Sequence, residues 1–462
     1  MVVPRTAWLT LVVTSLVGFM VSLEITVISL ARDEIARALP DASPSELSWV
    51  ITAYNIGIAS LLLPAGWAAD RYGRRRLFLW GLGIFAVGSF ASGLANSSEA
   101  LIAFRILQSV GGALQFPTGL ALLLTAFPLA KRQTAIGVWG AMGGLAAALG
   151  PSLGALLIDG FGWRAVFLIN VPVAIVALLI GPRWLQESTG EHAPGRVDLL
   201  SVPLASLGVG SAILGIVQGS SWGWGSPSVV GSFVLAAVLI AIFVVRSSSH
   251  PVPLFDLALL RLPSYLIANL GSVLFVVAFF GWLITFPEFV QRTWGWSVLR
   301  TGFAIAPGPM LAAMISPVAG RLADRIGNAP ILVVGGCSGA LGALGHLVFT
   351  GAEPAYLTGV LLPGLLLGIS GGCSFAMLVG ASMRDIGPSR YGMAGAGRTT
   401  MFQLSIAVGV AVAISLVGSP ADETAAVGAL QRVWLLSAVL FAGQAALFAF
   451  VFPARPPVGA AS

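Results

Sequence analysis

The sequence predicts an all-α membrane protein with 14 transmembrane helices, built as two six-helix pseudo-repeat halves with two extra helices between them. Three observations predict this class: the composition, the length of the apolar runs and a short motif that occurs twice. The chain has 462 residues, of which 57% are hydrophobic and 9% are charged, whereas a soluble domain carries about a quarter charged residues. Its mean hydropathy is +0.94. A lipid bilayer is therefore the expected solvent.

Fourteen apolar runs are long enough to cross a bilayer, because a hydrocarbon core about 30 Å thick needs about 20 residues of helix. Each run is predicted to be helical, since lipid cannot satisfy free backbone groups. In chain order the predicted spans cover residues 7–31, 48–67, 77–94, 101–124, 135–158, 165–180, 199–217, 229–245, 265–286, 302–322, 331–349, 356–380, 393–417 and 433–452. The first run is longer than a signal-peptide core and lacks a small-residue cleavage pattern, so we expect it to be retained.

Basic residues predict the orientation of these spans. They fall mostly on alternate connections, for example at Arg74, Arg75 and Arg76 and at Lys131 and Arg132. Because cytoplasmic connections carry the excess of Lys and Arg, both termini are predicted to be cytoplasmic in a multi-pass protein. The Ala-, Gly- and Arg-rich composition suggests a bacterial genome, and hence the bacterial cytoplasmic (inner) membrane. This placement also explains the net charge of +6 without a nucleic-acid partner.

Nothing in the sequence indicates an enzyme. Cys337 and Cys373 lie in apolar runs, without the spacing of a zinc site or a disulfide framework. The three histidines are scattered, so no catalytic triad or metal set can be assembled. No phosphate-binding GxxxxGK[ST] motif occurs, which argues against ATP as the energy source. We therefore expect no cofactor and no metal, and a proton gradient as the source of energy.

A repeated element follows the second and tenth predicted spans. Residues 66–73 read GWAADRYG and residues 320–327 read GRLADRIG, with Asp70 and Asp324 in the same register. Two copies imply two homologous halves, which transporters use for alternating access. The offset of 254 residues (324 − 70) is too long for six spans, so spans seven and eight are placed between the halves. The predicted domains are residues 1–181, 182–263 and 264–462.

The repeated element is predicted to act as a conformational switch. A helix-end aspartate followed by arginines offers charge pairs and helix-dipole contacts that form in one state and break in another, and glycine allows a tight turn. The alternative is that the arginines only anchor the topology. The candidate switch residues are Gly66, Asp70, Arg71, Gly73, Arg74, Asp324 and Arg325.

These motifs resemble those of the major facilitator superfamily, and specifically its fourteen-span drug:proton antiporter family. The segment 66–76 resembles the superfamily signature after the second helix, and residues 105–112 (RILQSVGG) resemble its fourth-helix motif. Residues 146–155 (AAALGPSLGA) resemble the fifth-helix antiporter motif, with alanine for glycine at both ends. The resemblance implies that Gly150, Pro151 and Gly154 form a hinge or seal, although glycine-rich faces are commonly packing faces.

Glu24 is the only acidic residue well inside a predicted span, at a position where the family resembled here usually has aspartate. A charge at mid-membrane costs about 2.5–3.5 kcal/mol on insertion scales, so such residues are usually functional. We expect Glu24 and Arg105 to couple transport to protons. The alternatives are a structural carboxylate that pairs permanently with Arg105 or bonds to Thr26 or Tyr54, and an Arg105 that snorkels to the outer headgroups.

A group of polar and aromatic residues could line a substrate cavity, although each alone is more often a packing residue. The candidates are Tyr54, Asn55, Gln115, Phe116, Trp139, Glu288, Phe375 and Gln403. Of these, Glu288 could instead be a solvated interfacial group. Arg398 could be an anchor at the inner face.

The resemblance implies proton-coupled efflux of small hydrophobic drugs or antibiotics by alternating access, and the single buried acid fits lipophilic cations. Two alternatives remain open: a proton-coupled symporter that takes up a small metabolite, and a non-transporting membrane scaffold or sensor. The expected partners are the lipid bilayer, a small hydrophobic substrate and protons, with no nucleic acid. We expect a monomer.

Overall fold

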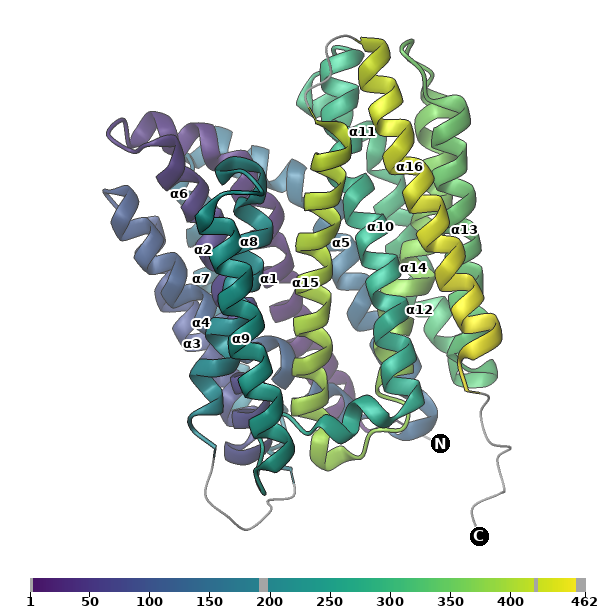
Figure 1. Ribbon diagram of the computed structural model, residues 1–462. Coiled ribbons are helices and arrows are strands. Elements are labelled where there is room, and N and C mark those ends of the chain that lie inside the picture. Colours follow the sequence, from purple (N-terminus) through teal and green to yellow (C-terminus); the bar gives the residue numbers. More distant parts are fainter. Residues whose placement is uncertain (1–2, 191–197, 419–422, 454–462) are drawn as a thin grey trace. The chain divides into compact units, whose positions relative to one another are not determined.

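The computed structural model describes residues 3–190, 198–418 and 423–453, and within these ranges the chain forms helices and no strand (Figure 1). The α-helices of the first half are α1 (Arg5–Ala38), α2 (Pro44–Tyr72), α3 (Arg74–Gly93), α4 (Ser98–Ala126), α5 (Arg132–Phe161), α6 (Arg164–Leu168) and α7 (Asn170–Trp184). Then follow α8 (Ser201–Trp222) and α9 (Pro227–Ser249). The second half has α10 (Pro263–Thr293), α11 (Val298–Ile305), α12 (Pro307–Ile326), α13 (Asn328–Phe349), α14 (Leu362–Ser382), α15 (Tyr391–Val417) and α16 (Glu423–Ala446).

Short segments connect or extend these helices. The 3-10 turns are η1 (Leu129–Lys131), η2 (Leu257–Arg261) and η4 (Pro388–Arg390), and the π-helical turns are η3 (Tyr356–Leu361) and η5 (Leu447–Val451). Two predicted spans are interrupted helices. The sixth is α6 and α7 with a break at Ile169, and the tenth is α11 and α12 with a break at Ala306.

Thirteen helical segments of the described chain are long and apolar enough to cross a membrane. Each coincides with one of the predicted spans. The remaining prediction, residues 135–158, falls in α5, a continuous helix of 30 residues in which several side chains lie outside the described residues. The multi-span helical class is therefore confirmed, and the count of fourteen stays a prediction.

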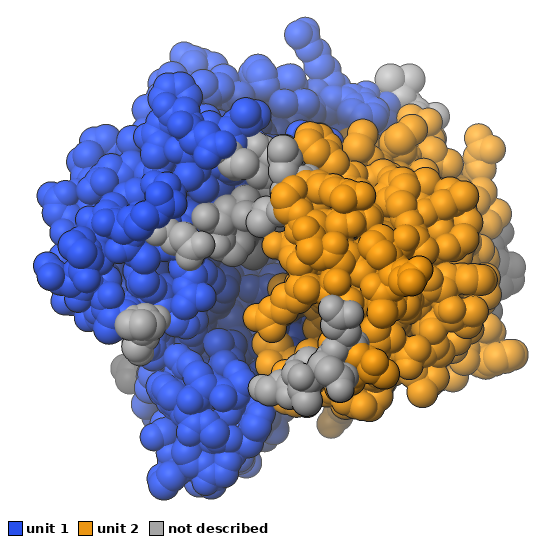
Figure 2. All heavy atoms as spheres, turned by 90° about the horizontal axis from the view of Figure 1, so that it is seen from above, with its two compact units in different colours: residues 1–128, 142–257, 387–411 blue, residues 129–141, 258–386, 412–462 orange. Residues whose placement is uncertain are grey.

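The chain divides into two compact units, coloured blue and orange in Figure 2. Unit 1 contains Met1–Pro128, Met142–Leu257 and Gly387–Ala411, and unit 2 contains Leu129–Ala141, Ala258–Ile386 and Val412–Ser462. Unit 1 thus holds most of α15 from the second half of the sequence, and unit 2 holds the first turns of α5. The domain boundaries at 181/182 and 263/264, which follow the sequence repeat, stay a prediction.

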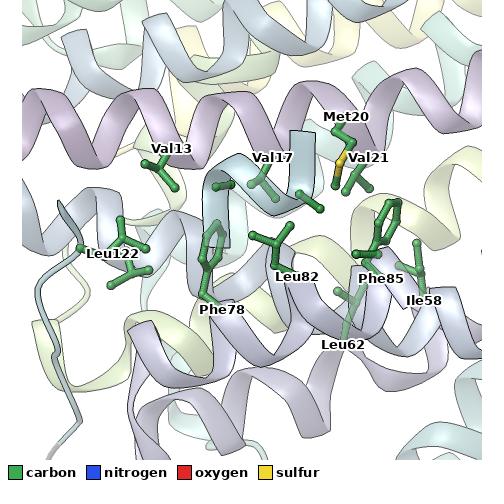
Figure 3. Close-up of a cluster of buried hydrophobic side chains, with 14 of the residues drawn as sticks. Val13, Val17, Met20, Val21, Ile58, Leu62, Phe78, Leu82, Phe85 and Leu122 are labelled. Carbon is green, nitrogen blue, oxygen red and sulfur yellow. The ribbon is translucent and has the colours of Figure 1, made fainter. Parts of the chain in front are cut away.

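The packing of unit 1 is led by an apolar face of α1. Val13, Val17 and Val21 recur every four residues and point into a buried cluster (Figure 3). Facing them are Phe78, Leu82 and Phe85 of α3, with Ile58 and Leu62 of α2 and Leu122 of α4. Close packing of this kind holds helices together in lipid, where the hydrophobic effect between helices is weak. Glu24 follows Val17 and Val21 at helical spacing, so the same packing turns its side chain inward.

Local sequence signals fix the ends of α2. Ser43 and Glu46 form a capping box, in which the Ser43 N–H donates to Glu46 Oε2 at 2.7 Å and the Glu46 N–H donates to Ser43 Oγ at 3.2 Å. At the other end, Gly73 alone separates α2 from α3 with φ +105°. A side chain is strained at that φ, so glycine is needed for the tight turn.

Candidate functional site

The carboxylate of Glu24 forms a buried ion pair with Arg105 inside unit 1. Oε1 of Glu24 accepts a hydrogen bond from Nη1 of Arg105, and both side chains have 0% exposure. Glu24 lies on α1 and Arg105 on α4, so the pair joins two helices. A charged pair in this setting is stable only when further hydrogen bonds satisfy both ions.

Three neutral side chains complete a closed ring of hydrogen bonds with this pair. Arg105 Nη1 also donates to Oε1 of Gln108 at 2.7 Å, and Gln108 Nε2 donates to Oγ of Ser89 at 3.2 Å. Asn170 Nδ2 donates to Ser89 Oγ at 3.1 Å and to Oε2 of Glu24 at 2.6 Å. The Ser89 hydroxyl donates to the Phe167 carbonyl at 2.8 Å. Every member of the ring is buried.

Arg105 makes further contacts that hold its guanidinium in place. Its Nε donates to the carbonyl of Val50 on α2 at 3.1 Å. The guanidinium carbon lies 4.0 Å from the ring centroid of Tyr54 and 5.6 Å from that of Phe167, within cation–π range. Among the described residues Nη2 of Arg105 has no hydrogen-bond partner. The positive charge of Arg105 is therefore stabilised by hydrogen-bond acceptors and aromatic rings in addition to Glu24.

The helices can meet here because of small residues. A Cβ placed on Gly88 of α3 would lie 2.7 Å from the backbone nitrogen of Gln108 on α4, closer than real Cβ contacts allow. Glycine at this position thus lets the backbones of α3 and α4 touch. As a result, Ser89 and Gln108 come within hydrogen-bond distance.

The structure decides between several readings of these residues. Arg105 is completely buried, so it does not snorkel. It pairs with Glu24 in this conformation, which is compatible with both the proton-coupling role and the structural pair. The Tyr54 hydroxyl has no hydrogen-bond partner among the described residues, so the alternative of a bond between Glu24 and Tyr54 is not observed. The Thr26 side chain lies outside the described residues.

Sequence reasoning missed Ser89 and Asn170 and gave Gln108 no role. Their signal was a polar side chain within a predicted apolar span, 77–94 for Ser89 and 165–180 for Asn170. That signal is weak, since hydroxyl and amide groups in membrane helices often bond only to their own backbone. The ring becomes visible only when α1, α3, α4 and α7 are assembled.

The first copy of the repeated element also forms a buried charge cluster in unit 1. Asp70 Oδ1 accepts hydrogen bonds from Nε and Nη2 of Arg74 at 3.0 and 2.7 Å. The same carboxylate accepts the backbone N–H groups of Gly392 at 2.9 Å and Met393 at 2.8 Å. Arg74 Nη2 also donates to the Pro388 carbonyl at 2.5 Å. Asp70 thus caps the N-terminus of α15, where an anion is favoured.

The second copy forms the corresponding contact in unit 2. Asp324 of α12 accepts the backbone N–H groups of Gln133 at 3.0 Å and Thr134 at 3.1 Å, and also the Thr134 hydroxyl. These residues begin α5. Each aspartate of the repeat therefore caps a helix from the opposite half of the sequence.

The other residues of the element differ in their surroundings. Gly66 packs against α15, since a Cβ there would lie 2.3 Å from Cβ of Ala396 and 2.4 Å from the Gly392 carbonyl oxygen. Arg71 lies 6.0 Å from the Trp67 ring. Arg325 is exposed and forms no ion pair within the described ranges.

A sequence model of the Major Facilitator Superfamily matches residues 8–410. The chain belongs to this superfamily.

Relatives within the superfamily include named resistance and export proteins. The chain is 34% identical over 412 residues to the multidrug resistance protein Stp of Mycobacterium tuberculosis, which covers 88% of this chain and 75% of that protein. It is 35% identical over 328 residues to the tetracenomycin C resistance and export protein of Streptomyces glaucescens, which covers 71% of this chain and 61% of the relative.

Solved structures support the fold alone. The proton:xylose symporter XylE matches with a TM-score of 0.67 and 14% identity, covering 96% of each chain. The family match and these relatives together show a multi-pass membrane transporter of the superfamily.

The residues that resemble the antiporter motif lie in α5. Gly150 and Gly154 occupy buried positions there. Pro151 falls within the helix, but its side chain lies outside the described residues. A hinge or seal at this motif stays a prediction.

The predicted cavity residues are spread over both units. In unit 1, Tyr54 belongs to the Arg105 site, Gln115 Nε2 donates to the Gly81 carbonyl at 3.1 Å, and Phe116 packs on the cluster of Figure 3. Asn55 and Gln403 are half-buried.

In unit 2, Phe375 packs edge-on against Phe275 and Phe279, with ring centroids 4.7 and 5.1 Å away. Trp139 is half-buried, and Glu288 pairs with Arg292 at 2.9 Å with its side chain 51% exposed. That exposure favours the interfacial reading of Glu288. A cavity of ≈ 680 Å³ lies in unit 1, where residues of α3 and α7 and Leu107 of α4 line it, and none of the eight candidates does. A shared substrate cavity stays a prediction.

Proposed function

We propose that this protein exports small hydrophobic drugs or antibiotics, cationic ones among them, across a bacterial cytoplasmic membrane in exchange for protons. The observation that carries the proposal is the match over 88% of the chain to a multidrug resistance protein. A second relative is named for resistance to one antibiotic and for its export. The protein then acts as a carrier with alternating access, as a monomer with both termini in the cytoplasm.

Proton coupling is assigned to Glu24 and Arg105. Placing two fully buried ionisable side chains inside a membrane helix bundle costs free energy, and this cost supports a functional role for the pair. When Glu24 takes up a proton, the net charge of the ring rises by one, and this change can bias two conformations. One charge that crosses 100 mV is worth about 2.3 kcal/mol, so one proton per cycle can drive accumulation of the drug.

The sealed position of Glu24 adds a requirement to this cycle. Both carboxylate oxygens are engaged and the side chain has 0% exposure. Exchange with water therefore needs a second conformation in which the ring opens. If the ring never opens, Glu24 and Arg105 form only a structural pair and the proton must use another site.

The two capping aspartates are assigned to the conformational switch. Asp70 on α15 and Asp324 on α5 make contacts that hold two helix N-termini in the present state. Breaking them costs charge-assisted hydrogen bonds, so the two caps favour this state until substrate or proton binding offsets the loss.

The test of export is dye efflux in a bacterial host that lacks its own pumps. Cells loaded with ethidium, a lipophilic cation, are expected to lose dye faster with the wild-type protein than with Glu24→Gln. The matched control is Glu99→Gln, an exposed acid at the start of α4, which should behave as wild type. Unchanged efflux in Glu24→Gln would remove Glu24 from the mechanism.

The direction of coupling separates export from the other candidate functions. In vesicles with an imposed pH gradient, an exporter moves dye against the direction of proton flow, whereas a symporter moves its substrate with the protons. A scaffold or sensor moves neither. A panel of quaternary ammonium compounds and antibiotics then defines the substrate class.

A further inference from the structure

The two oxygens of the Glu24 carboxylate are held by chemically different partners. Oε1 is bound by the charged guanidinium of Arg105, whereas Oε2 is bound by the neutral amide of Asn170 at 2.6 Å. Both hydrogen bonds are strengthened by the negative charge of the carboxylate, but only the bond from Arg105 adds the attraction between two opposite charges. Oε2 is therefore the oxygen that is easier to free for a proton.

The charged and titratable groups that face Glu24 are few. Among the described residues they are Arg105 on α4 and the Tyr54 hydroxyl on α2. The remaining neighbours in the ring are the neutral side chains of Gln108, Ser89 and Asn170. When Glu24 becomes neutral, Arg105 keeps the Gln108 oxygen, the Val50 carbonyl and the Tyr54 ring. The guanidinium can thus stay buried while Glu24 changes its charge.

Asn170 differs from Arg105 because an amide can serve both charge states of a carboxyl group. Its nitrogen donates to an ionised carboxylate, and its oxygen can accept from a protonated acid after the amide turns about its Cβ–Cγ bond. Asn170 is also the first residue of α7, next to the break at Ile169. Its side chain is therefore placed where two short helices meet, inside the sixth span.

We propose that Asn170 is a positioning residue for the proton step: it holds Oε2 of Glu24 while the carboxylate is ionised and releases that oxygen to take up the proton. A proton from water forms the O–H bond at Oε2, and the Asn170 amide turns to present Oδ1 to it. The reverse steps return the proton to water. This assignment rests on the proposed proton-coupled function of Glu24.

The test follows the protonation of Glu24 directly, without a substrate. Infrared spectra of the full-length protein in lipid are recorded across a pH series, and the carboxylic-acid C=O band of Glu24 is assigned by its loss in Glu24→Gln. The variants are Asn170→Leu, which removes the amide, and Asn170→Asp, which keeps the shape and adds a carboxyl group. The matched control is Asn269→Leu, a buried amide on α10 that bonds to the Tyr265 carbonyl.

Loss of the amide donor makes the ionised form of Glu24 less favourable. In Asn170→Leu the midpoint of the acid band is expected to rise by about one pH unit, a tenfold change in proton affinity. In Asn170→Asp it should rise further, because two adjacent carboxyl groups share a proton. The control should keep the wild-type midpoint. An unchanged midpoint in Asn170→Leu, or in Asn170→Asp if the leucine variant fails to fold, overturns the proposal.

Failure of this assignment and failure of the export proposal give different results. If wild-type dye efflux ignores the proton gradient while the acid band shifts as expected, the export proposal fails and Asn170 still positions Glu24. If efflux is proton-driven but the band does not move in the Asn170 variants, only the role of Asn170 is lost.

Discussion

At the scale of single residues, the site depends on the shape of its groups as much as on their charge. Arg105 reaches Glu24, Gln108 and Val50 in different directions and lies over the Tyr54 ring. Only a planar guanidinium offers donors in this fixed fork together with a face for an aromatic ring. A lysine carries the same charge, but all its N–H donors sit on one nitrogen and it has no planar face. We therefore expect transport and stability to depend on arginine at position 105, and not only on a positive charge there.

We expect Arg105→Lys to reduce proton-driven dye efflux by at least about tenfold and to lower the free energy of unfolding by about 2 kcal/mol, since buried acceptors lose charged donors. Efflux rate and thermal unfolding in detergent are the measurements. Arg300→Lys, at an exposed residue over the Trp296 ring, is the control and should change neither. Wild-type efflux in Arg105→Lys would show that charge alone is sufficient.

At the scale of elements, contacts between helices are set by positions where a side chain would not fit. Gly66 of α2 touches the backbone and a methyl group of α15, so the two helices pack without a gap. At Gly83 of α3, by contrast, an added Cβ would meet nothing within 4 Å among the described residues. The sequence shows a glycine at both positions and does not tell a tightly packed glycine from one beside open space.

We expect Gly66→Val to separate α2 from α15 and to disturb the Asp70 cap one turn away. The transition temperature in detergent should fall by several degrees, equivalent to about 1–3 kcal/mol of overpacking, and dye efflux should fall with it. Gly83→Val serves as the control, because its side chain enters open space. Equal effects of the two substitutions would contradict the assigned contact.

The pair α8 and α9 run side by side in Figure 1 and are joined at one end by Asp198 and Arg246, with 2.7 Å between Oδ1 and Nε. Asp198 lies just outside the span. Burial opposes its ionisation, but hydrogen bonds from Ser201 and Arg246 outweigh that effect and hold the pKa of Asp198 below its ordinary value. The pair thus stabilises the hairpin only when Asp198 is ionised.

Because the folded pKa is lowered, this stabilisation is present above the unfolded value of about 3.9 and is lost as the pH falls through the folded value. We expect Asp198→Asn to cost about 1–2 kcal/mol at pH 7 and nearly nothing at a pH below the folded value. Thermal unfolding of both proteins from pH 7 down to below the folded value measures the difference. A cost that does not depend on pH would exclude the ionic origin.

At the scale of the whole molecule, the repeated element appears once in each unit. Asp70 caps α15 in unit 1 and Asp324 caps α5 in unit 2. Within the described ranges the two carboxylates share no hydrogen-bond partner. The sequence repeat is thus matched by a repeated physical contact.

We expect Asp70→Asn and Asp324→Asn each to lower the free energy of unfolding by about 1 kcal/mol through loss of a charged helix cap. The double variant should lose the sum, since sites without shared partners are usually additive. Chemical or thermal unfolding of the four proteins measures this. Asp385→Asn, at a partly exposed pair with Arg384, is the control. If the loss in the double variant differs strongly from the sum of the two single losses, the two caps are energetically coupled.

The sequence by itself determined the helical membrane class, the position of thirteen spans, the repeated Asp70 and Asp324 element, and Glu24 and Arg105 as residues to examine. These follow from local composition, because lipid requires long apolar helices and penalises each charge within them. Only the tertiary structure decided that Arg105 is sealed against Glu24, that Ser89 and Asn170 close the ring, and that each repeated aspartate caps a helix from the opposite half of the sequence. Such contacts join side chains tens or hundreds of residues apart, and no local pattern specifies which neutral polar groups will meet when the helices pack.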